Sequence, residues 1–194
     1  MLYFTSDLHF DHQNIIKYCN RPFGSVEEMN ETIIANWNKT VRAKDTCYIL
    51  GDVFMYNTEN ARKCLERLHG HKYLVRGNHD PFKDSDPAFG WIKDYFKLRW
   101  DHKKFILCHY PFVSWDGEAK GSYHLHGHQH NEPIYNIAQR VNGLKRFDVG
   151  VDANDFKPVS IEGIIAFFDY KKEDGIPISD EEFVEMFGHH KDFV

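Results

Sequence analysis

LYFTSDLHFDH, residues 2–12, is the stretch from which the fold can be worked out. Its first four residues are apolar, aromatic or β-branched and predict a short strand. The polar residues that follow place Asp7 and His9 where this strand gives way to a loop. Side chains able to do chemistry at the end of a strand are typical of sheets that bind their ligands at the carboxyl ends of the strands.

The same pattern of a short apolar run followed by a polar turn recurs further along the chain. The two further examples are CYILGD, residues 47–52, and KYLVRGNHD, residues 72–80. Amphipathic patterns at helical spacing lie between the runs, one opened by a capping box of Ser25 and Glu28 and the other spanning residues 58–69. Strands that alternate with helices predict an α/β domain with right-handed crossovers.

The second half of the chain carries β-type runs with few helical signals between them. These runs are residues 105–108, 123–125, 147–149 and 161–168. They predict a second sheet with more antiparallel character. A short helix is expected over residues 180–187, with Ser179 as its N-cap and Gly188 at its end. Because no linker or internal repeat interrupts the chain, a single domain of two packed sheets is expected over residues 1–194.

Composition and charge limit the classes of function. The 194 residues are 42% hydrophobic and carry a net charge of -5, which suits one core and predicts no long basic track for nucleic acid. No apolar run has the length of a membrane span and the first residues do not resemble a secretion signal, so no membrane partner and a cytoplasmic location are expected. The four cysteines show no CxxC spacing and are expected to be reduced thiols.

Five polar clusters hold the side chains most suited to chemistry. In chain order they are Asp7-x-His9, Gly51-Asp52, Gly77-Asn78-His79-Asp80, His109 and Gly127-His128-Gln129-His130. Their imidazole, carboxylate and amide groups suit a transition-metal ion better than Ca²⁺. Alternate side chains of a strand share a face, so His128 and His130 are expected to point into one site while Gln129 points away.

The order of these clusters resembles the calcineurin-like metallophosphoesterase superfamily, whose signature blocks are DxH, GD, GNHD or GNHE, a lone H, and GHxH. All five blocks are present between Asp7 and His130, about the first two thirds of the chain. The resemblance implies a four-layer αββα sandwich of two mixed β-sheets flanked by helices, with two divalent metal ions at the strand ends. Residues 7–23 look like the same region of small bacterial and phage-type members.

The resemblance also implies a role for each residue of the blocks. A pair of metal ions needs one ligand that both share, and Asp52, the only carboxylate of its block, is the predicted bridge. By likeness, the first ion takes Asp7, His9 and His130, and the second takes Asn78, His109 and His128. Mn is favoured among Mn, Fe, Zn, Co and Ni, all of which suit this mixed set of ligands.

His79 and Asp80 are the predicted catalytic residues. The resemblance implies that His79 contacts the scissile phosphate and protonates the leaving oxygen, and that Asp80 orients His79. An imidazole paired with a carboxylate can be cationic near neutral pH, which is what proton donation requires.

Outside the blocks, His12 and Arg21 are candidates for substrate binding. A guanidinium is a natural fork for a phosphate oxygen. A salt bridge or a helix cap is the alternative explanation for either residue.

These assignments predict a dimetal phosphoester hydrolase in which a hydroxide that bridges the two ions attacks phosphorus. The expected substrate is a small or nucleotide-like phosphodiester, slightly ahead of a phosphomonoester. Two alternatives stay open: a strict phosphomonoesterase, and a catalytically silent scaffold that keeps the fold, as a retromer subunit has done. The sequence assigns no oligomeric state.

Overall fold

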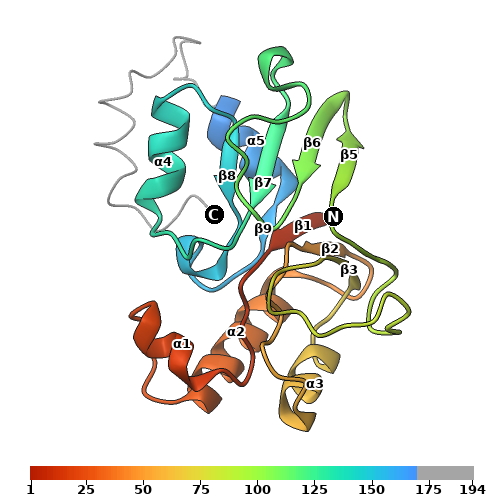
Figure 1. Cartoon of the computed structure of the whole chain (residues 1–194), viewed down its shortest axis with the longest axis vertical. Helices are drawn as coiled ribbons and strands as arrows, with labels where there is room; N and C mark the ends of the chain where they lie inside the picture. Colours follow the sequence, from red (N-terminus) through yellow and green to blue (C-terminus); the bar gives the residue numbers. More distant parts are fainter. Residues whose placement is uncertain (170–194) are drawn as a thin grey trace.

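A five-stranded sheet carries the first half of the chain in the computed structural model, which describes residues 1–169 (Figure 1). Its order is β4-β3-β2-β1-β9; the first four strands run parallel to one another and β9 runs antiparallel to β1. The strands are β1 (Leu2–Thr5), β2 (Thr46–Ile49), β3 (His71–Val75), β4 (Ile92–Lys93) and β9 (Val159–Ser160). The predicted α/β alternation is confirmed for this half.

The second sheet has four strands in the order β5-β6-β7-β8. They are β5 (Phe96–Trp100), β6 (Lys103–Leu107), β7 (Tyr123–His126) and β8 (Arg146–Asp148). Only β5 and β6 pair antiparallel, whereas β6, β7 and β8 are parallel. The expected antiparallel character is therefore confined to one hairpin. The parallel pairs depend on long crossovers, one of which contains helix α4 (Ile134–Val141). The N-cap residue of α4 is Pro133, which makes no side-chain capping hydrogen bond.

Helices cover the outer face of the first sheet. They are α1 (Gln13–Tyr18), α2 (Val26–Thr40) and α3 (Glu59–Glu66). The Ser25 hydroxyl accepts a hydrogen bond from the Glu28 N–H at 3.1 Å, as the capping box predicts, but the Glu28 carboxylate accepts from the Gly24 N–H at 2.7 Å. Thr58 caps α3 by accepting from the Ala61 N–H at 3.0 Å. The short 3₁₀ turns η1 (Glu118–Lys120) and η2 (Val151–Ala153) lie in loops.

Residues 161–168, predicted as a strand, are helical and belong to α5 (Ile161–Asp169). The Ser160 hydroxyl accepts from the Gly163 N–H at 2.9 Å and starts the helix. Ile161, Ile164 and Phe167 are buried, which is helical spacing within a mostly apolar run. The helix expected over residues 180–187 lies outside the described residues.

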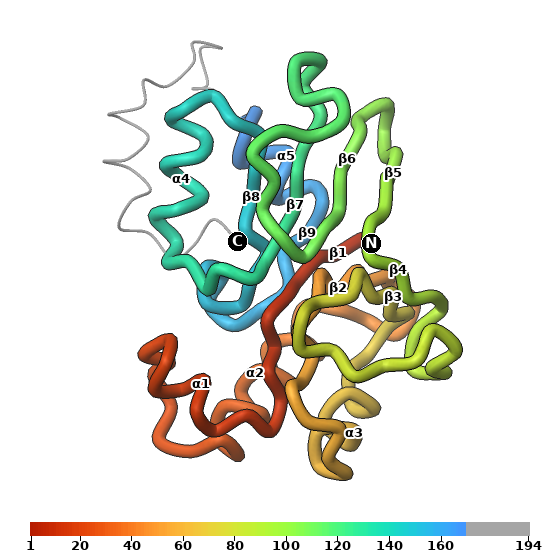
Figure 2. Tube along the Cα trace, in the orientation of Figure 1, coloured from red at the N-terminus to blue at the C-terminus, as the bar shows by residue number. Residues whose placement is uncertain are grey.

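The inner faces of the two sheets share a core that includes Phe4 and Leu50 from the first and Phe105, Leu125 and Phe147 from the second. An isolated parallel bridge between Ser6 and Gly150 joins the end of β1 to the segment after β8. Figure 2 shows the segment after β1 running between the two halves of the molecule. The packing therefore brings strand ends from both sheets to one place.

All four cysteines are free thiols, as expected. Within residues 1–169, no helix combines the length and the apolar character that a membrane crossing requires.

Candidate metal centre

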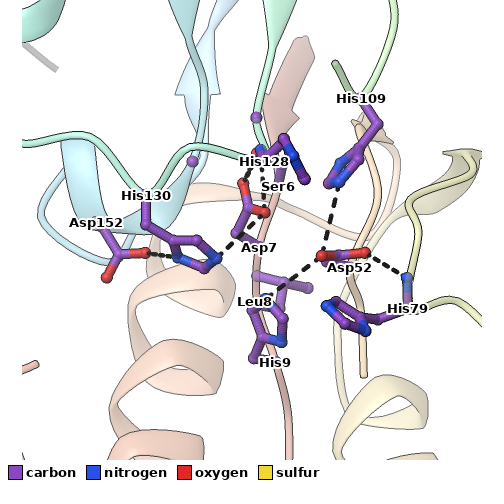
Figure 3. Close-up of polar contacts among 12 residues, drawn as sticks. Ser6, Asp7, Leu8, His9, Asp52, His79, His109, His128, His130 and Asp152 are labelled. Carbon is purple, nitrogen blue, oxygen red and sulfur yellow. Dashed lines mark hydrogen bonds and ion pairs between the residues drawn. The ribbon is translucent and has the colours of Figure 1, made fainter. Parts of the chain in front are cut away.

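The residues of the five sequence blocks meet at the ends of strands from both sheets (Figure 3). Asp7 and His9 follow β1, Asp52 follows β2, and Asn78 follows β3. The second sheet contributes His109 after β6, and His128 and His130 after β7. The structure thus brings all seven predicted metal ligands into one neighbourhood, although the first and the last, at positions 7 and 130, lie 123 positions apart in the sequence.

One group of ligand atoms consists of Asp7, His9 and His130, whose coordinating atoms lie within 4.8 Å of one another. The His130 Nε2 atom is 3.8 Å from Asp7 Oδ1. Burial opposes a charge on His130, but its hydrogen bonds to Asp152 and Cys19 and the charges of Asp7 and Asp152 outweigh that effect and raise its pKa to about 10. The surroundings of His130 therefore favour a positive charge at this position.

The second group is built around Asp52. Its Oδ2 atom lies 3.6 Å from His109 Nε2 and also 3.6 Å from His9 Nε2, so one carboxylate oxygen faces both groups. The Asn78 Oδ1 atom is 2.9 Å from His109 Nε2. The His128 ring centroid is 5.0 Å from that of His109, and the His128 N–H donates to the Asp7 carboxylate.

Two arrangements of donor atoms fit bound cations. His9 Nε2 is buried without a hydrogen-bond partner. Burial lowers the pKa of His9, and the charge of Arg21 lowers it further, so the ring stays neutral and the lone pair of one ring nitrogen stays available. His109 Nδ1 lies 2.7 Å from the Leu50 carbonyl oxygen and therefore carries the proton. In the neutral form of His109 the lone pair of Nε2 faces the Asn78 oxygen, and two acceptors that face each other suit a cation between them.

Buried carboxylates add a further reason for positive charge at this site. Asp7 is fully buried and Asp52 is 2% exposed. Burial raises the pKa of Asp7 to about 6, despite the opposing effects of His130 and His109. A buried carboxylate is costly unless a cation or hydrogen bonds compensate it, so divalent ions fit these residues.

Most of the predicted ligands lie on strained backbone. Asp7, His9, Asp52, His128 and His130 all have φ between 50° and 72°, in the left-handed region. Each non-glycine residue there costs roughly 1–2 kcal/mol, and such strain is concentrated at functional sites. Because β7 ends at His126, the prediction that strand alternation aligns His128 and His130 is wrong. A turn with two left-handed histidines brings them to the site.

Gly127 lets two loops approach more closely than a side chain would permit. A Cβ built on Gly127 would overlap the Ser6 hydroxyl and Asp7 Oδ2. Gly77 plays the same part for Asp52, because its Cβ would overlap Asp52 Oδ1. Neither glycine has a positive φ, so close approach is the reason for both.

Gly127→Ala is accordingly expected to destabilise the fold by ~1–3 kcal/mol, the usual cost of overpacking, and to weaken metal binding through displaced Asp7. Urea denaturation and metal titration measure the two effects. Gly24→Ala is the matched control, because its Cβ would meet only the end of the Glu28 side chain, at 3.3 Å. Wild-type metal affinity in Gly127→Ala would show that the close approach does not matter to the site.

His79 lies beside the two groups of ligands, on the same loop as Asn78. Its main-chain N–H donates to Asp52 Oδ1 at 3.0 Å, and its ring centroid is 5.7 Å from that of His9. The side chain is therefore close to the centre without taking part in either group of ligand atoms.

Asp80 makes different contacts from the predicted ones. Its carboxylate accepts hydrogen bonds from three main-chain N–H groups, those of Asp52 at 2.9 Å, Val53 at 2.8 Å and Gly77 at 2.8 Å. Burial raises its pKa to about 6. Amide donors of two loops occupy the carboxylate, so Asp80 holds the GD and GNHD loops together and the expected bond to the His79 ring is not made.

Arg21 is engaged within the protein in a salt bridge, the alternative to its predicted contact with substrate phosphate. Its Nε and Nη2 atoms donate to the two carboxylate oxygens of Asp152, both at 2.8 Å. The remaining donors reach the Asp7 carbonyl at 2.7 Å, the Leu8 carbonyl at 3.2 Å and Met29 Sδ at 3.4 Å. All five N–H groups of a guanidinium are thereby used.

His12 is buried against the site, with its Nδ1 atom 3.3 Å from His9 Nδ1. The exposed rings of Tyr18 and Tyr56 pack edge-on to it, each with centroids 6.4 Å away. Burial lowers the pKa of His12. A substrate role for His12 stays a prediction.

Sequence reasoning missed Asp152, which accepts a hydrogen bond from His130 Nδ1 at 2.7 Å. It lies in η2, shortly after β8. A carboxylate soon after a strand is the same signal that identified Asp7 and Asp52, but no sequence block contains Asp152.

The fold and this geometry agree with a comparison against known families. A family model described as calcineurin-like phosphoesterase matches residues 2–190. The chain belongs to the calcineurin-like phosphoesterase family. Membership supports a metal-dependent phosphoester hydrolase, and the ligand groups above are consistent with bound divalent ions.

Similar proteins come from distant sources. The uncharacterized protein MJ1445 of Methanocaldococcus jannaschii is 38% identical over 173 residues, which are 88% of this chain and 93% of that protein. The gene 66 protein of Mycobacterium phage L5 is 26% identical over 78% of this chain and 86% of its own length. The crystal structure of AQ665, a protein of unknown function from Aquifex aeolicus, superposes with a TM-score of 0.69 at 29% identity and covers 85% of this chain and 97% of its own.

Proposed function

We propose that this calcineurin-like phosphoesterase is a dimetal hydrolase of small or nucleotide-like phosphodiesters, with phosphomonoesters as poorer substrates. The observation that carries the proposal is the position of Asp52 Oδ2, which lies 3.6 Å from an imidazole nitrogen on each side. A single carboxylate oxygen between two groups of donors is what a bridged pair of ions needs.

Each group would hold one ion, with Asp52 shared between them. The first would use Asp7, His9 and His130, and the second would use Asn78, His109 and His128. Two divalent cations, Mn in first place, would supply Lewis acidity and an activated water for attack on phosphorus. The protein's own contribution is to hold the imidazoles and two buried carboxylates in fixed positions before substrate binds.

The remaining step falls to His79. Its main-chain bond to Asp52 fixes the loop beside both groups, while its imidazole stays available. A protonated His79 would give its proton to the leaving oxygen as the P–O bond breaks, which prevents an unstable alkoxide from departing. His12 is proposed to contact the substrate from the side of His9.

The test is a panel of phosphoesters offered to protein that has been freed of metal and then reconstituted with Mn²⁺. We expect turnover of bis(4-nitrophenyl) phosphate, slower turnover of 4-nitrophenyl phosphate, and loss of both on chelation. Faster turnover of the monoester would favour a phosphomonoesterase instead. No turnover by protein that elemental analysis shows to hold two ions would contradict the proposal and favour a silent scaffold.

A further inference from the structure

We propose that Arg21 and Asp152 act as a positioning pair that orients the ligands of the first ion. The inference rests on the proposed metal centre and adds two residues outside the sequence blocks. Neither residue is expected to touch substrate, because every donor of Arg21 already has an acceptor in the protein.

Asp152 determines which nitrogen of His130 is free. Its Oδ2 atom is 2.7 Å from His130 Nδ1, and a carboxylate can only accept, so the proton of a neutral His130 stays on Nδ1. The lone pair is then on Nε2, the atom that faces Asp7 Oδ1 (Figure 3). Carboxylates that hold metal-binding histidines in this way are a general means of tuning metal sites.

Arg21 fixes Asp152 and at the same time fixes the loop that carries the other two ligands. The pair is bidentate, which restrains the carboxylate in two directions. The same guanidinium donates to the carbonyls of Asp7 and Leu8, the latter being the residue before His9. One side chain, 0% exposed, is thus bonded to the backbone beside two ligands and, through Asp152, to the third.

A strained turn at Asp155 and Phe156 packs beside the Arg21 guanidinium. Asp155 and Phe156 have φ of 50° and 56°, an unfavourable conformation for a bulky residue. Asn36 holds this turn by donating to both carbonyls, at 3.4 and 3.2 Å. The result places the Phe156 ring 5.8 Å from Arg21 Cζ. Strain held in place beside Arg21 agrees with a need for a fixed guanidinium.

The chain contains a matched pair that can separate positioning from simple stabilisation. Arg62 and Asp86 also form a bidentate pair, with Nη1 and Nη2 at 3.1 and 2.7 Å from the two carboxylate oxygens. Arg62 likewise packs on an aromatic ring, 5.0 Å from the Phe82 centroid. The hydrogen bonds of its side chain go to Asn57 and Asp86 and to no residue of the metal centre.

The experiment compares Asp152→Asn with Asp86→Asn. In Asp152→Asn the amide can present an N–H to His130 Nδ1, which drives the imidazole proton onto Nε2, where the ion would bind. We expect calorimetric titration with Mn²⁺ to show a ~10–100-fold loss of affinity at one of two sites, the usual effect of removing such a partner. Asp86→Asn is expected to lower the melting temperature and to leave both Mn²⁺ affinities unchanged.

Arg21→Lys provides a second variant that keeps the charge but cannot bond to Asp152 and two carbonyls in the same geometry. We expect the same loss at one site, with the fold retained by circular dichroism. If Asp152→Asn and Arg21→Lys lower the melting temperature as Asp86→Asn does but bind Mn²⁺ like the wild type, the pair is only structural. A wild type that binds two ions without hydrolysing phosphoesters would overturn the proposed function and leave this comparison valid.

Discussion

Asp52→Asn is expected to lower the metal content at both positions and to reduce phosphoester turnover on the order of a thousand-fold, the upper end for loss of one electrostatic group. Asp52 Oδ2 faces His9 and His109, while Oδ1 accepts from the His79 N–H. An asparagine has one oxygen for these two positions. Its NH₂ group would therefore point either at the His79 N–H or at the bound ions, and both arrangements are unfavourable.

Elemental analysis of the reconstituted variant measures this effect directly, and the phosphoester panel gives the rate. Asp94→Asn is the control, because the Asp94 side chain is 89% exposed and the substitution removes the same charge from an ion pair with Arg76, outside the candidate metal centre. Two tightly held ions in Asp52→Asn would show that the shared oxygen is not needed. Loss of only one ion would assign Asp52 to a single site and contradict the bridge.

The residues of the candidate metal centre could be predicted from the sequence because each sequence block follows a short β-type run. Phe4, Ile49 and Leu107 are fully buried, and their burial fixes the strands after which Asp7, Asp52 and His109 come. Short apolar runs followed by polar residues thus predict both the strands of the sheet and the position of the site.

The supporting contacts could not be found in this way. Arg21 and Asp152 are 131 residues apart, and only the packed fold shows that they meet. From the sequence, a guanidinium near a phosphate site is equally suited to substrate and to a carboxylate. The contacts of Asp80 could not be predicted for a similar reason, since the spacing of GNHD does not reveal that three main-chain N–H groups surround its carboxylate.

The mostly apolar run of residues 161–168 was the weakest guide to the fold. Ile161 to Phe168 suits a buried strand or a buried helix, and the deciding contact is the Ser160 hydroxyl, which accepts from the Gly163 N–H. The turn at His128 and His130 could not be predicted either, because a positive φ at a histidine has no signal in the sequence. Strain of this kind depends on surrounding packing, which local patterns do not encode.

His79→Ala is expected to keep both ions and to lose activity in proportion to how poor the leaving group is. The main-chain bond from residue 79 to Asp52 survives the substitution, so the ligand groups should remain in place. What the variant lacks is an imidazole that can protonate the departing oxygen. General acid catalysis contributes about 10²–10⁴-fold when the leaving oxygen needs a proton, and little when it leaves readily as an anion.

The measurement is kcat/KM for a series of phosphodiesters whose leaving alcohols range from 4-nitrophenol to simple alkyl alcohols, with metal content determined for each preparation. His71→Ala, at an exposed position on β3, is the control for removal of an imidazole. We expect a steeper dependence of rate on leaving-group pKa in His79→Ala than in the wild type. An equal loss for every ester would mean that His79 stabilises charge on the phosphoryl group instead of donating a proton, because that interaction is independent of the leaving alcohol.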